Sequence, residues 1–97
     1  MYLGKEENNM FSKIDDLLEE RFSYEDDEYA ICPYDDNGIS LESAITQLFK
    51  DEGFADNEFS VEMSTVFSSP AIDVGYVSVA YVDWGKLHHD VYEFESR

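Results

Sequence analysis

The chain is poor in basic residues, in cysteine and in proline. Its 97 residues include one cysteine, two prolines and only 6 Lys and Arg. The single Cys32 can form neither an internal disulfide nor a zinc site built from cysteines, which fits a reducing cytoplasm. No apolar run approaches the ~18 residues that a membrane span needs. The first ten residues also lack the apolar segment of a secretory signal. We therefore expect a cytoplasmic protein with no membrane partner.

Acidic residues are abundant instead. The 23 Asp and Glu give a formal net charge of -17 and a pI near 4.1. A domain with this much like charge repels itself on folding, so we expect the charge to serve a function. It would disfavour direct contact with nucleic acid or anionic lipid and favour a positively charged protein surface. With 43% hydrophobic and 15% aromatic residues, the chain is predicted to fold as one acidic domain over residues 1–97, unlike a disordered acidic tail.

The hydrophobic pattern changes period along the chain. Apolar residues at helical spacing predict a helix over about residues 9–22, and Ser40 looks like the N-cap of a second helix that stops at Gly53. Residues 23–28 read as an acidic connector, 29–32 as a short strand and 35–38 as a turn. Residues 59–67, 72–83 and 87–95 have strand patterns, with a hairpin turn at 83–86 and the middle segment as the central strand. The prediction is an α+β fold with two helices packed on a three- to four-stranded antiparallel sheet.

Motifs for catalysis or for metal binding are weak. His88 and His89 are neighbours on a predicted strand, so their rings point to opposite faces and cannot easily share a metal. The turn at Asp35 resembles a fragment of a calcium loop, but Pro33 and Ala44 stand where the first and last ligands would be. A dyad of Cys32 with a histidine would require the fold to bring the two together. The sequence has no glycine-rich phosphate loop and no nucleophile elbow. We expect no enzymatic activity, no cofactor and no metal.

The acidic residues fall into three groups that could form one surface. Carboxylates at i and i+4 of a helix lie about 6 Å apart, and alternate residues of a strand are separated by nearly the same distance, about 6–7 Å. This spacing is comparable with that of phosphates along a nucleic-acid strand. Tyrosines inside the acidic stretches are candidate interface anchors. The predicted partner-binding residues are Asp15, Asp16, Glu19 and Glu20 in the first helix, Tyr24, Glu25, Asp26, Asp27, Glu28 and Tyr29 after it, and Glu93 and Glu95 in the last strand.

In size and charge the chain resembles the DNA-mimic inhibitors encoded by phages and mobile elements. That group includes anti-CRISPR proteins, anti-restriction proteins and inhibitors of uracil-DNA glycosylase. The resemblance covers the whole chain but lies in composition alone, so it assigns no role to any residue. It implies an inhibitor that occupies the nucleic-acid channel of a CRISPR effector or another nuclease, in the host cytoplasm if the gene is carried by a phage.

Other functions would also use an acidic surface. An immunity protein or antitoxin that neutralises a basic nuclease toxin would make nearly the same contact. Adaptation to high salt is a further explanation of the acidic composition, but the 15% of aromatic residues argues against it. The apolar surplus of residues 72–82 leaves room for a weak dimer, so the chain is expected to be a monomer or a weak dimer.

Overall fold

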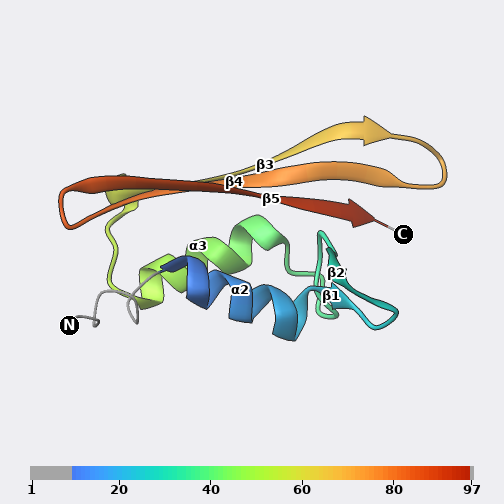
Figure 1. The fold of residues 1–97 in the computed structure, drawn as a ribbon, viewed down its shortest axis with the longest axis horizontal. Coiled ribbons are helices and arrows are strands. Elements are labelled where there is room, and N and C mark those ends of the chain that lie inside the picture. The colour runs from blue at the N-terminus through green and yellow to red at the C-terminus, as the bar shows by residue number, and fades with distance from the viewer. Residues whose placement is uncertain (1–9, 97) are drawn as a thin grey trace.

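The computed structural model describes residues 10–96 and has an α+β fold, as the sequence predicts (Figure 1). Two helices pack on one face of a three-stranded antiparallel sheet, and a small two-stranded sheet lies beside them. The elements in chain order are α2 (Met10–Arg21), β1 (Ser23–Tyr24), β2 (Asp27–Ile31), α3 (Leu41–Asp51), a 3-10 turn η1 (Asp56–Glu58), β3 (Phe59–Ser68), β4 (Asp73–Asp83) and β5 (Lys86–Ser96).

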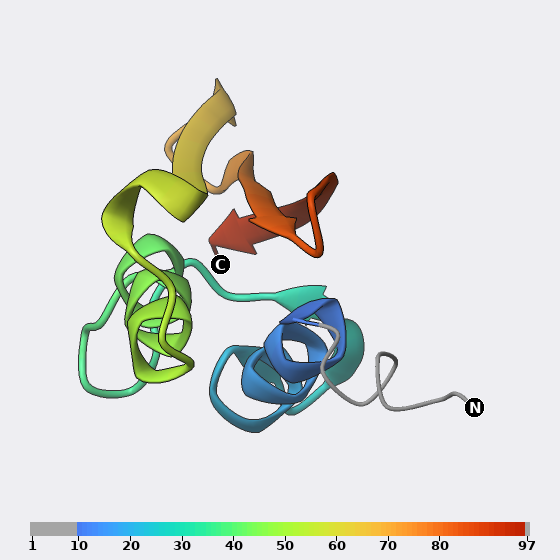
Figure 2. The same cartoon turned by 90° about the vertical axis from the view of Figure 1, so that its left-hand side faces the viewer.

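Both helices begin and end close to where the sequence predicts. The buried side of α2 carries Met10, Ile14 and Leu18 at helical spacing. Ser40 caps α3, because its side-chain oxygen accepts the backbone N–H of Ser43 at 3.1 Å. The chain leaves α3 at Gly53, whose φ of +94° belongs to the left-handed region that glycine adopts most easily. Figure 2 shows the two helices side by side beneath the sheet.

The three-stranded sheet has the order β3-β4-β5, so the segment predicted as central is the central strand. A tight turn joins β4 to β5, with positive φ at both Trp84 (+56°) and Gly85 (+73°), as a type I′ hairpin requires. The β3–β4 register shifts between Thr65 and Phe67, which marks a β-bulge at Val66.

The core lies between the helices and the inner face of the sheet. Strand β4 contributes Val77, Val79 and Tyr81, whose side chains alternate with outward-facing ones. Phe49 of α3 is fully buried, and its ring packs against the rings of Phe54, Phe59 and Tyr81. This aromatic cluster holds α3 against β3 and β4. Because the helices cover only this face of the sheet, the opposite face has no covering layer in the described part of the chain (Figure 1).

Residues 23–28 do not form the simple connector that the sequence suggested. They form β1, a turn at Glu25 and Asp26, and the start of β2, and the two strands pair as an antiparallel hairpin. The Asp27 carboxylate accepts the backbone N–H of Tyr29 at 3.0 Å. The acidic run therefore has a defined shape, since its backbone is held by a hairpin and by a side-chain hydrogen bond.

Candidate functional site

A groove runs between α2, the β1–β2 hairpin and the edge strand β5. The residues that line its first part are Asp15, Leu18, Glu19, Ser23, Tyr29, Ile31 and Tyr92. The adjoining part shares Tyr29 and Ile31 and is completed by Ala30, Val74, Glu93, Phe94 and Glu95. Segments that are far apart in the sequence, and that were each predicted to bind a partner, thus meet along one depression. We call this depression the acidic groove.

The helical period explains which acids of α2 reach the groove. Asp15 and Glu19 lie one turn apart, on the flank of the helix next to the buried Leu18. Asp16 and Glu20 follow them by one residue each, are exposed, and do not line the groove. The helix therefore divides its four predicted carboxylates into a pair in the groove and a pair outside it.

Asp15 also faces a carboxylate of β5. Burial, and then the negative charges of Asp90 and Asp16, raise the pKa of Asp15 above its usual range. Asp90 lies on the inner face of β5, because its cross-strand neighbour is the buried Val79. Strand β5 thus supplies the groove's second wall with an acid opposite the helix. Like charges in this arrangement repel each other in the isolated chain.

Tyr92 of β5 lines the groove together with Asp15, Leu18 and Glu19 of α2, and both Asp15 and Asp90 act on it electrostatically. Its hydroxyl oxygen is buried and has no hydrogen-bond partner among the described residues. Burial, followed by the charges of Asp15 and Asp90, raises the pKa of this phenol. Tyr92, which lines the groove, therefore carries a buried hydroxyl whose hydrogen-bonding capacity is not used by the described residues.

The basic residues of the described chain lie away from the groove. Lys13 pairs with Glu52 at 2.6 Å, Arg21 pairs with Asp35 at 2.6 Å, and Lys50 approaches Asp56 at 3.9 Å. Lys86 is the first residue of β5, next to the β4–β5 turn. None of the residues that line the groove is basic, so its carboxylates have no cation on the lining to offset them.

The acidic hairpin is fixed to the end of β5. The hydroxyl of Tyr24 donates a hydrogen bond of 2.6 Å to the backbone carbonyl of Glu95. This bond places the exposed turn residues Glu25 and Asp26 near the carboxyl end of the last strand. Asp27 is half-buried, and the side chain of Glu28 lies outside what the structure describes. The hairpin thus extends the acidic groove at one end.

The tyrosines of the acidic stretches have different environments. Tyr29 is 88% exposed and lies where the two parts of the groove meet. Tyr24 is half-buried and its hydroxyl is used to hold the hairpin. Tyr29 therefore fits the description of an interface anchor better than Tyr24 does.

The remaining candidate sites have structural roles. Asp35 accepts backbone N–H bonds from Asn37 and Ile39, both at 2.9 Å, and the Arg21 guanidinium lowers the pKa of its carboxyl. The rings of His88 and His89 point to opposite faces, as predicted, with His88 stacked on Tyr81 and His89 bonded to Ser78. Among residues 10–96, no group of three His, Cys, Asp or Glu side chains could hold a metal ion.

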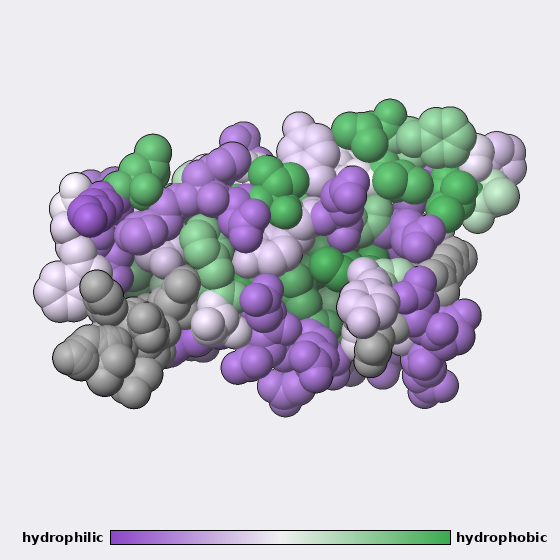
Figure 3. All heavy atoms as spheres, viewed as in Figure 1, coloured by the Kyte–Doolittle hydropathy of each residue, from purple (hydrophilic) through white to green (hydrophobic). Residues whose placement is uncertain are grey.

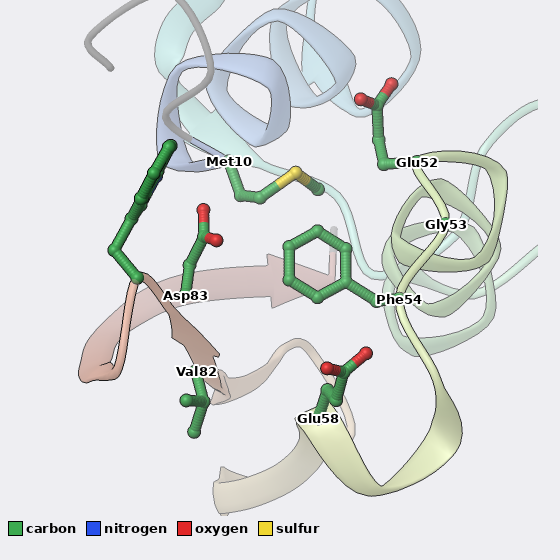
Figure 4. Close-up of a pocket in the computed structure, with 8 residues that line it drawn as sticks. Met10, Glu52, Gly53, Phe54, Glu58, Val82 and Asp83 are labelled. Atoms are coloured by element: carbon green, nitrogen blue, oxygen red, sulfur yellow. The ribbon is translucent and has the colours of Figure 1, made fainter.

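A second hollow lies at the other end of the molecule (Figure 4). Met10, Phe54 and Val82 contribute to its wall, and carboxylates border it from different elements. Glu52 is engaged by Lys13, and Glu58 accepts the backbone N–H of Ala55 at 2.8 Å. These two carboxylates hold structural positions, and Asp83 is the third acid of the hollow.

Within the described residues, no helix is long and apolar enough to cross a membrane.

Two polar residues that bear on the groove were not predicted as partner-binding residues. Tyr92 lines the groove, and Asp90 acts on Asp15 from β5. A usable signal was present, since strand alternation puts Asp90 on the same face as Tyr92 and Phe94. A carboxylate at an inward-facing strand position is unusual and indicates either an ion pair or a binding surface.

Comparison with known proteins adds no relative. No protein-family model matches the chain, and neither a curated protein nor a solved structure shows significant similarity to it.

Proposed function

We propose that this domain binds the basic nucleic-acid-binding surface of another protein and so occupies the place of the nucleic acid. The observation that supports this most directly is the acidic groove. It has carboxylates on both walls, from α2 and from β5, and no basic residue among those that line it. A Lys or Arg side chain of a partner would supply the missing positive charge.

The electrostatics of Asp15 favour such a partner. Its raised pKa means that the charged carboxylate is disfavoured in the isolated chain, largely by burial and by Asp90. A guanidinium between Asp15 and Asp90 would replace repulsion by attraction and could donate hydrogen bonds to both carboxylates.

Tyr29 adds a contact that does not depend on net charge. Its exposed ring stands between Glu19 on one side of the groove and Glu93 on the other. An Arg that reaches the groove can stack on this ring, and such cation–π contacts contribute about 0.5–2 kcal/mol. The groove therefore combines rigid aromatic surface with a row of acids.

The proposed partner is a defence or DNA-processing protein of the host, with a CRISPR effector as the first choice. This choice rests on the compositional resemblance to DNA-mimic inhibitors. The same groove would serve an immunity protein or antitoxin against a basic nuclease toxin. The two possibilities differ in the partner, so one binding panel separates them.

A competition experiment tests the proposal. Labelled DNA is bound to a panel of CRISPR effector complexes, restriction enzymes and uracil-DNA glycosylase, and the full chain is titrated in at about 50 mM and 200 mM salt. We expect displacement from at least one member, with an affinity that falls at the higher salt because charges are screened. A panel of basic nuclease toxins run in parallel tests the immunity function.

Charge reversal locates the contact. The variant with Glu25→Lys and Asp26→Lys changes the exposed hairpin turn, and the matched control with Asp36→Lys and Asp51→Lys changes two exposed acids outside the groove. We expect the hairpin variant to lose at least tenfold in affinity and the control to lose much less. Equal losses would mean that only net charge matters, and binding that ignores salt would contradict the proposal.

A further inference from the structure

Trp84 is the only tryptophan of the chain, and its ring lies outside the core. The residue is 76% exposed, and among residues 10–96 its ring has no aromatic, cationic or hydrogen-bonding partner. Its φ of +56° is a conformation that bulky residues rarely adopt, and this position of a type I′ turn favours Asn, Asp or Gly. Figure 3 shows hydrophilic side chains over much of α2, so the chain does not lack polar residues for its surface. Strained positions of this kind cluster at ligand-binding sites.

Trp84 lines the hollow at the end of the molecule opposite the β1–β2 hairpin (Figure 4). The volume of the hollow, about 350 Å³, lies within the range of about 300–1,000 Å³ that is usual for ligand pockets. Its lining includes Met10 at the start of α2 and Phe54 after α3. The Phe54 ring, which Figure 4 shows inside the hollow, is held edge-on against the rings of Phe49 and Tyr81. The hollow therefore has one rigid aromatic wall besides the exposed indole.

The charge that lines the hollow is entirely negative. Glu52, Glu58 and Asp83 line it, and no lining residue is basic. Glu52 is paired with Lys13, and one oxygen of Glu58 accepts the backbone N–H of Ala55. The Asp83 carboxylate has no ion pair or hydrogen bond among the described residues, and Figure 4 shows it turned into the hollow. An uncompensated carboxylate thus lies beside the exposed indole of the next residue.

This combination favours an organic cation over a metal ion. The three acids are not grouped closely enough for a metal, since no set of three His, Cys, Asp or Glu side chains within residues 10–96 could hold one. A guanidinium is planar, stacks on aromatic rings and donates parallel hydrogen bonds to a carboxylate. Indole is the aromatic ring that makes the strongest cation–π contacts. The ammonium of lysine has no planar face to stack, so arginine fits the hollow better.

We propose that this hollow binds an arginine side chain of a protein partner, with the guanidinium stacked on Trp84 and hydrogen-bonded to Asp83. The alkyl stem of the arginine packs against Met10 and Phe54, as long basic side chains do on apolar surfaces. The hollow shares no residue with the acidic groove and lies at the other end of the molecule. The arginine site therefore does not depend on the proposed function, and each can fail without the other.

The fluorescence of the single tryptophan reports on this site directly. The full chain is titrated with Nα-acetyl-arginine amide at constant ionic strength. We expect a saturable change in Trp84 fluorescence, with binding at least threefold tighter than that of the lysine analogue. The citrulline analogue has nearly the same shape but no charge, and should give no saturable change. No tryptophan lines the acidic groove, so arginine bound there does not contact the reporter. A response to arginine that does not saturate, or an equal response to citrulline, would overturn the proposal.

Asp83→Asn keeps the shape of the side chain and removes its charge. It should weaken binding of the arginine analogue at least threefold, because a charged acceptor is lost. The matched control Asp36→Asn removes an exposed acid that does not line the hollow, and should leave binding unchanged. Circular dichroism confirms that both variants are folded. Equal losses in the two variants would overturn the assignment of Asp83.

Trp84→Asn separates binding from folding. Asparagine is favoured at this position of the turn, so the Tm should stay the same or rise. The NMR amide signals of Asp83 and Gly85, which shift with the arginine analogue in the wild-type chain, should no longer do so. A Tm that falls by more than a few degrees would show that the ring serves the fold, and shifts that persist would show that the ring does not bind. Either result overturns the proposal.

Discussion

Gly75 is the position where one added methyl group should do the most damage. It lies on the inner face of β4, between the neighbouring strands. A Cβ atom built there would lie 2.6 Å from Cζ of Phe94, 3.0 Å from Cα of Thr65 and closer still to the backbone carbonyl oxygen of Ser64. The ring could turn aside, but the carbonyl belongs to the β3 ladder and cannot. Gly75→Ala must therefore push β3 and β4 apart or bend β4.

The cost can be estimated from comparable changes. Overpacking a core costs about 1–3 kcal/mol and occasionally more, and a clash with backbone puts this variant at the upper end. The lower entropy of the unfolded alanine chain offsets about 0.4–1 kcal/mol. A net loss of about 2–3 kcal/mol in the free energy of unfolding remains, which corresponds to a fall in Tm of roughly 10–20 °C for a domain of this size.

Thermal and urea denaturation followed by circular dichroism measure this loss, with Gly85→Ala as the control. Gly85 has nothing within 4 Å of an added Cβ, and its φ of +73° brings conformational strain alone. That strain is about 1–2 kcal/mol before the same entropic offset. If Gly75→Ala unfolds within a few degrees of wild type, the close approach of β3 to β4 is wrong.

Three smaller changes test the electrostatics and the caps. Asp15→Asn should raise the free energy of unfolding at neutral pH by a few tenths of a kcal/mol, because it removes like-charge repulsion. A raised pKa means that the folded state holds the proton of Asp15 more tightly than the unfolded state does, so this gain in stability should vanish near about pH 3, where both states are protonated. Equal gains at neutral pH and at about pH 3 in urea titrations would refute this sign. Ser40→Ala should cost about 1 kcal/mol by the same assay, and no loss would argue against the observed cap. Arg21→Met should raise the pKa of Asp35, measured by NMR, because the Arg21 guanidinium is the main cause of its lowering. The free energy of unfolding should then fall less steeply on acidification. An unchanged pKa of Asp35 would exclude the ion pair.

Much of the fold could be predicted because local signals agree with the tertiary structure. Ser40 and Gly53 mark the two ends of α3, and Trp84-Gly85 occupies a tight turn between alternating strands. The apolar stripe of α2 and the uncharged run of β4 predicted that side chains of these two elements pack in the core. The β1–β2 hairpin was missed because residues 23–28 are mostly acidic and have no alternation that a strand would show. Its pairing depends on contacts such as that between Tyr24 and Glu95, which no local pattern contains.

The groove was predictable only in part. Charge and spacing pointed to acidic segments in α2, in the hairpin and in β5, but they did not indicate which acids of each segment face one another. The opposition of Asp15 and Asp90 arises from the way α2 lies under β5, and this depends on packing across the core. The burial of the Tyr92 hydroxyl has the same origin. Such features are properties of tertiary structure, and the sequence shows only which residues are available to form them.

Under the proposed function, the arrangement of acids in the acidic groove, and not the net charge alone, binds the partner. The direct test compares two triple variants with the same net charge in the DNA-displacement assay. One neutralises acids in and beside the groove (Asp15→Asn, Glu19→Gln and Asp90→Asn), and the other neutralises acids away from it (Asp36→Asn, Asp51→Asn and Glu62→Gln). We predict that the groove variant loses at least a hundredfold in affinity while the other stays within about threefold of wild type, because the groove acids lie close enough to act together on one bound cation and the others are dispersed. Equal losses in the two variants would contradict the account.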